Sequence, residues 1–318
     1  MTLVGCGALT TVQALRDPQL GIDVGSYLNA FHLSHSLDFL AGDTLYNFEI
    51  GFSLYAQFLA KQGLSDQWFL AITAIVTMLP VGLTIRRYSR MPALSVFLYA
   101  TLGFYLFSYS GLRQAMAVAI CFWAYRFIID RKPLPFLAMV LAASLFHQSA
   151  LAFIPAYWLF PILPTGPIVI AGIAIIIATF ALRAEIYPIL YSLYRDSPVL
   201  IENTGAGLLF VALALLWLAA LALGGPDDKG HNSPTLNGTR NYLYLAVLFQ
   251  ALASVSFIVG RTGYYYLIFL VLLVPELIER QEKPSIKAAM WLITVPACLL
   301  FFFTQAGAFG LNPYKSFN

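Results

Sequence analysis

The stretch that decides the fold is PLPFLAMVLAASLFHQSALAFIPAYWLFPILPTGPIVIAGIAIIIATFAL, residues 133–182, which contains no Asp, Glu, Lys or Arg. A membrane span needs about 20 apolar residues, whereas a soluble domain of this length must still cover a large surface facing water. The apolar residues run continuously instead of alternating, which indicates helices rather than the strands of a barrel. The stretch therefore predicts an integral membrane protein built of helices.

The rest of the chain has the same character. Of its 318 residues, 60% are hydrophobic and only 10% are charged, against about 45–50% and about 25% in ordinary soluble domains. Further apolar stretches cover residues 67–85, 91–112, 114–129, 205–226, 241–260, 262–275 and 288–314. We expect an all-α, polytopic membrane bundle of about nine or ten transmembrane helices. It would form one domain, 1–318, made of a short first helix (1–15), an extracytoplasmic region (16–66) and the helical bundle (67–318).

The distribution of charge predicts the orientation. Basic residues gather in three short connections, residues 86–90, 126–132 and 280–287, which the positive-inside rule places in the cytoplasm. The charged residues within 16–66 are mostly acidic, and this segment is predicted outside. Within it, 23–40 and 49–61 have the apolar spacing of amphipathic helices, which would lie on the outer surface rather than span. The net charge of +3 is too small to indicate a nucleic-acid partner.

Two local features complete the topology. Keeping both basic connections 126–132 and 280–287 inside requires an even number of crossings between them. A helix break at residues 146–149 satisfies this condition, with short helices over 135–146 and 149–160. The segment 225–240 is rich in turn-forming and polar residues and is predicted to be a mobile cytoplasmic loop.

Three polar residues lie in apolar segments, where a charged or polar side chain is costly and therefore indicates a function or a specific partner. Arg113 and Arg261 border apolar segments, and arginines at membrane depth usually face a cavity or a partner. A guanidinium group is well suited to phosphate, although both side chains are also able to reach the headgroups. His147 occupies the predicted break, where it is either a packing residue or a general base.

Two carboxylates open the amphipathic segments. Asp23 and Glu49 either stabilise a helix N-terminus or orient and deprotonate a hydroxyl group. His32, His35 and Asp38 have metal-ligand spacing, but no further ligand is apparent, so we expect no metal and no cofactor. The three cysteines are expected to be buried and free.

Several short motifs follow one another along the chain. They are Gly21-Ile-Asp23 followed by Tyr27 and Phe31, Glu49-Ile-Gly51-Phe52, Leu112-Arg113-Gln114-Ala115 with Ala117, Phe146-His147-Gln148-Ser149-Ala150, and Arg261 before a tyrosine run. In this order they resemble the motifs of the EpsG family of Wzy-type exopolysaccharide and O-antigen polymerases. The resemblance extends from about residue 16 to the last helices. Family members usually have a full first helix, so the beginning of this chain departs from the pattern.

The resemblance implies a membrane glycosyltransferase of the bacterial cytoplasmic membrane. Such an enzyme joins oligosaccharide repeat units, each carried on undecaprenyl diphosphate, at the outer face of that membrane. Its partners would be the lipid-linked oligosaccharide, the bilayer and a chain-length regulator. On this basis His147, Asp23 and Glu49 are catalytic candidates, and Arg113 and Arg261 would bind the diphosphate. The candidate sugar-binding residues are Tyr27, Gln114, Tyr264 and Tyr265.

Two other classes of protein remain open from the sequence. A transporter or flippase of lipid-linked saccharides would use the same arginines to hold phosphate without breaking a bond. A membrane-bound acyltransferase would also place a histidine near membrane depth to activate a hydroxyl group. The acidic outer region with its two amphipathic segments favours the polymerase.

Overall fold

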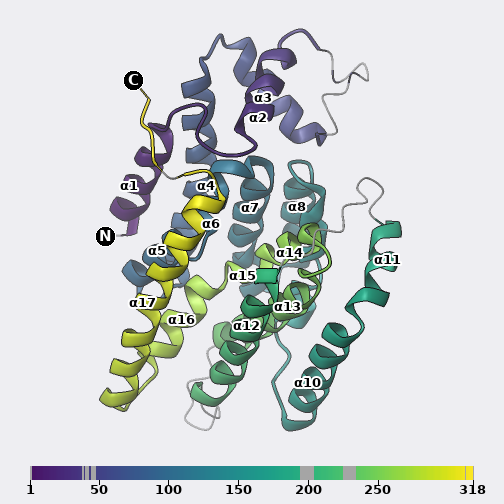
Figure 1. Ribbon diagram of the computed structural model, residues 1–318, viewed down its shortest axis with the longest axis vertical. Helices are drawn as coiled ribbons and strands as arrows, with labels where there is room; N and C mark the ends of the chain where they lie inside the picture. Colours follow the sequence, from purple (N-terminus) through teal and green to yellow (C-terminus); the bar gives the residue numbers. More distant parts are fainter. Residues whose placement is uncertain are drawn as a thin grey trace. The chain divides into compact units, whose positions relative to one another are not determined.

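The computed structural model describes residues 2–37, 39, 43, 48–193, 204–224, 234–311 and 313–317. These residues form helices and contain no strand, only one isolated bridge between Arg16 and Ser316, which confirms the all-α prediction (Figure 1). The chain divides into two compact units. Unit 1 comprises Met1–Ile154 and Val274–Asn318, and unit 2 comprises Pro155–Leu273.

Unit 1 is built around two long apolar helices, α4 (Asp66–Tyr88) and α7 (Leu112–Ile129), which pack against each other. The short first helix α1 (Thr2–Ala14) packs on α4, and α8 packs on α7. The other described elements of this unit are α2 (Val24–Ser34), α3 (Ile50–Lys61), α5 (Pro92–Thr101), α6 (Phe104–Ser110), α8 (Pro133–Ser144), the 3₁₀-helix η1 (Gln148–Phe153), most of α16 (Leu270–Glu279) and α17 (Pro284–Ala308).

Among the described residues, three helices are long and apolar enough to cross a membrane: α4, α7 and α17. The number rises to six when each of three bent helix pairs counts as one span. One of these pairs is α5 and α6, which meet at an angle of 47°. The protein is therefore a helical membrane protein, while the expected nine or ten crossings stay a prediction.

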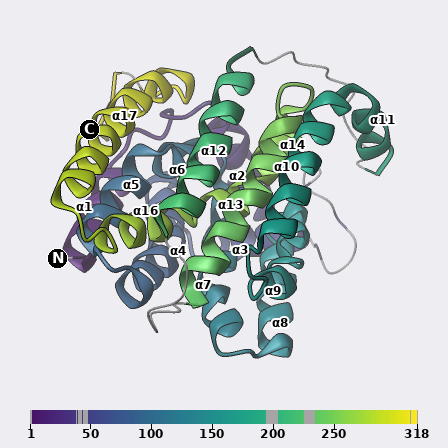
Figure 2. The same cartoon turned by 90° about the horizontal axis from the view of Figure 1, so that it is seen from below.

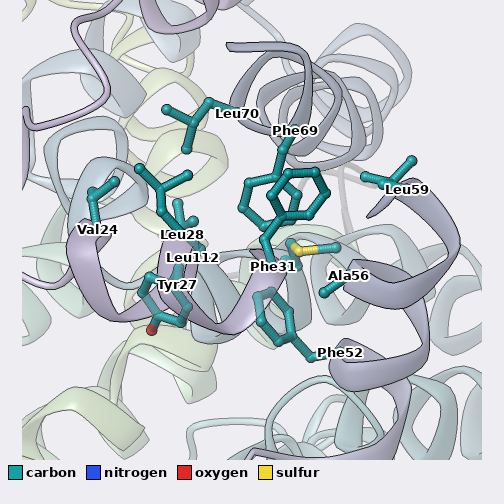
Figure 3. Close-up of a cluster of buried hydrophobic side chains, with 11 residues drawn as sticks. Val24, Tyr27, Leu28, Phe31, Phe52, Ala56, Leu59, Phe69, Leu70 and Leu112 are labelled. Atoms are coloured by element: carbon teal, nitrogen blue, oxygen red, sulfur yellow. The ribbon is translucent and has the colours of Figure 1, made fainter. Parts of the chain in front are cut away.

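The two predicted amphipathic helices are present as α2 and α3. Their apolar faces pack on the first turns of α4 and α7, around the stacked rings of Phe31 and Phe69, whose centroids are 4.6 Å apart (Figure 3). The buried cluster consists of Val24, Tyr27, Leu28, Phe31, Phe52, Ala56, Leu59, Phe69, Leu70, Leu112 and Met116. This packing holds the segments that open α2 and α3 close to the beginning of α7.

The three basic connections of the sequence meet at one end of unit 1. The Glu276 carboxylate accepts hydrogen bonds from Arg90 Nε at 3.1 Å and from Arg280 Nε at 2.8 Å. The Tyr88 ring packs edge-on against Tyr125, at a centroid distance of 5.1 Å, which brings the third connection alongside. These connections therefore share one end, as the charge pattern requires.

Unit 2 contains α9 (Ala156–Leu159), α10 (Gly166–Ala181), α11 (Arg183–Leu193), α12 (Thr204–Leu223), α13 (Pro234–Leu252), α14 (Phe257–Thr262) and α15 (Tyr264–Leu267). Helix α13 lies between α10 and α12 and packs on both (Figure 2). The predicted loop 225–240 is wrong in its second part, because α13 already begins at Pro234. Residues 234–240 are helical, because Pro234 is well suited to a first helical position, and only 225–233 lie outside the described residues.

The helix break at 146–149 is confirmed, but the helix predicted over 149–160 is wrong in its form. The chain forms the 3₁₀-helix η1 and then the single turn α9. Pro155 lies between them and has no N–H to continue a helical hydrogen-bond ladder, so one α-helix does not run through this segment.

Candidate functional site

His147 lies in the backbone break that follows α8. Its backbone is extended, with φ −157° and ψ 116°, between the end of α8 and the first residue of η1. Its side chain is 22% exposed, so the imidazole is partly accessible. A break of this kind presents both the side chain and the following backbone N–H groups to a neighbour, which a continuous helix would not do.

The neighbour is Glu49, which immediately precedes α3. Glu49 occupies the N-cap position in an extended conformation, but its carboxylate does not cap its own helix. Instead, Oε1 lies 3.0 Å from His147 Nδ1 and accepts a hydrogen bond of 2.9 Å from the backbone N–H of Gln148. The imidazole is close to Oε1 without being aligned for a regular hydrogen bond. Oε2 accepts a hydrogen bond from Arg113 Nη1.

A close backbone approach brings α3 to the break. The Phe52 N–H donates to the Leu145 carbonyl at 3.2 Å. A Cβ atom on Gly51 would lie 2.6 Å from both the Cβ and the carbonyl oxygen of Leu145. Only glycine permits this contact, which gives a physical reason for the glycine in the Glu49-Ile-Gly51-Phe52 motif.

Arg113 is placed by the beginning of α7. Its guanidinium carbon lies 4.1 Å above the centre of the Phe48 ring and 6.0 Å from that of Tyr27. The Arg113 Nε is buried and has no hydrogen-bond partner in the part of the chain that the structure describes. The guanidinium group therefore has donor capacity beyond its bond to Glu49.

The junction that leads into α7 is held by the Gly21-Ile-Asp23 motif of the outer region. The Ile22 N–H donates to Ser110 Oγ at 3.1 Å. Gly21 has a φ of +117°, and a Cβ atom there would lie 2.7 Å from the Tyr109 carbonyl oxygen. Arg16, which the sequence analysis did not single out, is fully buried and donates to the same carbonyl at 2.8 Å. These contacts fix the backbone three to four residues before Arg113.

The electrostatics of the cluster keep Glu49 ionised. Burial by itself raises the pKa of this carboxyl group, but the contact with His147, the charge of Arg113 and the Gln148 N–H together lower it to about 2. Glu49 is thus a carboxylate throughout the physiological pH range. The cluster of Glu49, Arg113 and His147 joins a fixed negative charge, a fixed positive charge and an imidazole.

The position of the cluster along α7 relates it to the basic end of unit 1. Arg113 is in the first turn of α7, and Arg126 is in its last turn. At 1.5 Å per residue, the two lie about 20 Å apart along the helix. The cluster therefore lies at the end of α7 opposite the basic connections.

Of the other predicted site residues in unit 1, Tyr27 and Gln114 lie beside the cluster. Tyr27 is buried and packs between Phe48 and Phe52, with centroid distances of 5.5 Å to each ring. Gln114 follows Arg113 and is also buried. Asp23 is half-buried at the N-cap of α2, where its side chain makes no capping hydrogen bond, and among the described residues no ion pair joins it to Arg113 or His147.

Arg261, Tyr264 and Tyr265 belong to unit 2. Arg261 is half-buried in the last turn of α14, with its guanidinium carbon 3.8 Å from the centre of the Phe257 ring. Tyr264 is half-buried, whereas the side chain of Tyr265 is completely buried, so Tyr265 presents no face to a sugar in this conformation. A joint site of Arg261 with the Glu49 cluster stays a prediction.

No group of three or more metal-ligating side chains is found among the described residues. His32 instead pairs with Asp66, with 2.5 Å between Nε2 and Oδ1, and Asp38 lies outside the described residues. The three cysteines are buried and free, as expected. Sequence reasoning missed Phe48, whose ring supports Arg113; the only signal for it was its place directly before Glu49.

The fold and this cluster define a helical membrane protein with a charged site at the end of a spanning helix. The chain belongs to the EpsG family, whose pattern it matches over residues 3–316, nearly its whole length. The family consists of exopolysaccharide and O-antigen polymerase-like proteins, which places this chain in polysaccharide biosynthesis. No curated protein and no solved structure matches the chain.

Proposed function

We propose that this protein is a polysaccharide polymerase that joins oligosaccharide repeat units carried on undecaprenyl diphosphate. The observation that carries the proposal is the cluster of Glu49, Arg113 and His147, in which a potential base and a phosphate-binding cation lie on one carboxylate. Family membership supports the polymerase class. The reaction would take place at the outer face of the bacterial cytoplasmic membrane, the side opposite the basic connections.

His147 would act as the general base. Its Nδ1 lies 3.0 Å from Glu49 Oε1, so Nε2 is the nitrogen that would accept the proton. The acceptor sugar's hydroxyl group loses its proton to Nε2 as its oxygen forms the new glycosidic bond. At the same time the bond between the anomeric carbon of the growing chain and the lipid diphosphate breaks, and the diphosphate takes the bonding electron pair.

Arg113 would stabilise the diphosphate as it leaves. Its guanidinium group holds Glu49 through Nη1 and keeps an unused buried donor at Nε, and its charge is permanent. Arg261 would be a second contact for the diphosphate. Tyr27, Gln114 and Tyr264 remain candidates for the sugar, and we propose no such role for the buried Tyr265.

The experiment is reconstitution of the purified protein in vesicles with lipid-linked repeat units. Elongation into a ladder of longer chains, in the absence of any sugar nucleotide, is the expected result. Transfer of the lipid-linked unit across the vesicle membrane without elongation would show a flippase instead. Product formation only with an added acyl donor would show an acyltransferase.

A further inference from the structure

We propose that Glu49 is a positioning residue, which holds His147 and Arg113 in a fixed relation to each other, and that it is not the general base. The inference rests on the proposed function and refines it. From the sequence, Glu49 was a candidate base together with His147 and Asp23; the contacts of its carboxylate separate these roles.

Both oxygens of Glu49 already serve as acceptors. Oε1 faces His147 Nδ1 and the N–H of Gln148, and Oε2 faces Arg113. A carboxylate offers about four lone-pair directions, so three of them are directed at groups of the protein. The low pKa of Glu49, about 2, agrees with this geometry, because a carboxylate that is so strongly stabilised is a weak base near neutral pH.

Glu49 also connects parts of the chain that are far apart in the sequence. It lies 64 residues from Arg113 and 99 residues from Gln148 in the sequence. Arg113 is carried by α7, and His147 lies in the break after α8. One carboxylate therefore sets the distance between a phosphate-binding cation and the imidazole.

The segment that carries Glu49 is itself anchored. Directly after it, Gly51 meets Leu145 and the Phe52 N–H donates to the Leu145 carbonyl, so the first turn of α3 is fastened to the break. Phe52 is fully buried in the apolar cluster beneath (Figure 3). Because of these contacts, we expect Glu49 to keep its position when an anionic substrate binds.

The consequence concerns the imidazole. A carboxylate at Nδ1 favours the tautomer with a proton on that nitrogen and leaves Nε2 free as an acceptor, and it stabilises the imidazolium once the proton has arrived. Without Glu49, the ring would lose this orientation while Arg113 remained available for the diphosphate. The proposal thus predicts a defect in turnover rather than in donor binding.

The test compares Glu49→Gln with Glu276→Gln in the reconstituted elongation assay. Glu276 is the control, because it is a buried carboxylate of unit 1 that is likewise held by two basic side chains, at the opposite end. We expect Glu49→Gln to lower kcat about 10- to 100-fold, as when a partner that orients a histidine is lost. The KM for the lipid-linked donor should stay at or below the wild-type value, and Glu276→Gln should keep the wild-type kcat.

Two further measurements separate positioning from folding. In a His147→Gln background, Glu49→Gln should cause no additional loss of kcat, because both changes disable the same unit. Nitrogen NMR of the four histidines should show one imidazole whose tautomer changes in Glu49→Gln and not in Glu276→Gln. This signal does not depend on polymerase activity, so it tests the inference even if wild-type protein fails to elongate and the proposed function falls.

Three results would overturn the proposal: a wild-type kcat in Glu49→Gln, losses that multiply in the double variant, or an unchanged histidine spectrum. Failure of Glu49→Gln to accumulate, while Glu276→Gln accumulates normally, would also overturn it by assigning Glu49 to folding.

Discussion

In unit 1 the buried Glu276 and the partly buried Glu49 are each bound by two basic side chains, and the two carboxylates differ in what those partners are able to do. Glu276 is 8% exposed and is held by Arg90 and Arg280, both of which carry a permanent charge. Glu49 is 16% exposed and is held by one arginine and one histidine. Only the second cluster contains an imidazole, the side chain that most often acts as a general acid or base.

The backbone around the two carboxylates differs as well. Glu276 lies within a helix and binds Arg280 one turn later, so that part of its contact is local. Glu49 reaches into a break where the backbone itself donates a hydrogen bond. The comparison teaches that a buried ion pair alone does not mark a site, whereas an accessible imidazole on irregular backbone does.

The largest expected effect comes from His147→Gln, which keeps hydrogen bonding but cannot take up a proton at neutral pH. Elongation should fall about 10²- to 10⁴-fold, the usual contribution of a general base. The measurement is the elongation rate per folded protein, together with binding of the lipid-linked donor, which should persist. A near-normal rate would show that His147 is a packing residue. The Glu49 cluster would then have a structural role only, like the Glu276 cluster.

The second prediction compares Arg113→Lys with Arg90→Lys. Lysine keeps the charge but loses the fork of the guanidinium group, so Arg113→Lys should lower elongation about 10- to 100-fold, the effect of one lost charged hydrogen bond. Arg90→Lys should retain wild-type turnover, since Arg90 binds Glu276 at the end of unit 1 opposite the Glu49 cluster. Arg261→Lys should behave like Arg113→Lys. Equal activity of the Arg113 and Arg90 variants would contradict the diphosphate role.

The third prediction concerns the approach of α3 to the break. Gly51→Ala places a methyl group 2.6 Å from Leu145, so α3 must shift, at a cost of about 1–3 kcal/mol in stability and with loss of most elongation. Gly25→Ala in α2 is the control. Its Cβ would meet no atom within 4 Å, and alanine should stabilise that helix by about 0.5–1 kcal/mol. Thermal unfolding in detergent measures the stability of both variants. A Gly51→Ala variant as stable as the wild type would exclude the close contact between Gly51 and Leu145.

The fourth prediction is a pH dependence of stability. The pKa of Glu49 falls from 4.5 to about 2 on folding, so its favourable contribution is complete above about pH 4.5 and disappears as the pH drops towards 2. The gap in unfolding temperature between wild type and Glu49→Gln should therefore be widest near pH 6 and should narrow below pH 4.5. A gap that is independent of pH would mean that the Glu49 charge contributes nothing.

The last prediction concerns the side of the membrane on which the Glu49 and Glu276 clusters lie, and its cysteine substitutions should change activity least. A cysteine in place of the exposed Asp43 should react with an impermeant thiol reagent outside intact cells, and one in place of the exposed Arg86 should react only after permeabilisation. The three native cysteines are buried, so the background should be low. The reverse pattern would place the Glu49 cluster in the cytoplasm.

Much of the fold was readable from the sequence, because the length of an apolar segment and the distribution of charge are local quantities. They correctly indicated a helical membrane protein, the amphipathic helices α2 and α3, and the break at His147. Two predictions were wrong: a helix over 149–160, and a loop that continued to residue 240 beyond the start of α13 at Pro234. Both outcomes depend on where a proline falls relative to a helix.

The site was readable only as a set of candidate residues. The sequence by itself named Glu49, Arg113 and His147 for chemical reasons, as charged or titratable groups in apolar surroundings. Only the tertiary structure decided that they converge, that Asp23 does not contact them, and that Tyr265 is buried in the packing of unit 2. The physical reason is that these outcomes depend on side-chain directions and on contacts between residues 64 and 99 positions apart, which no local pattern specifies.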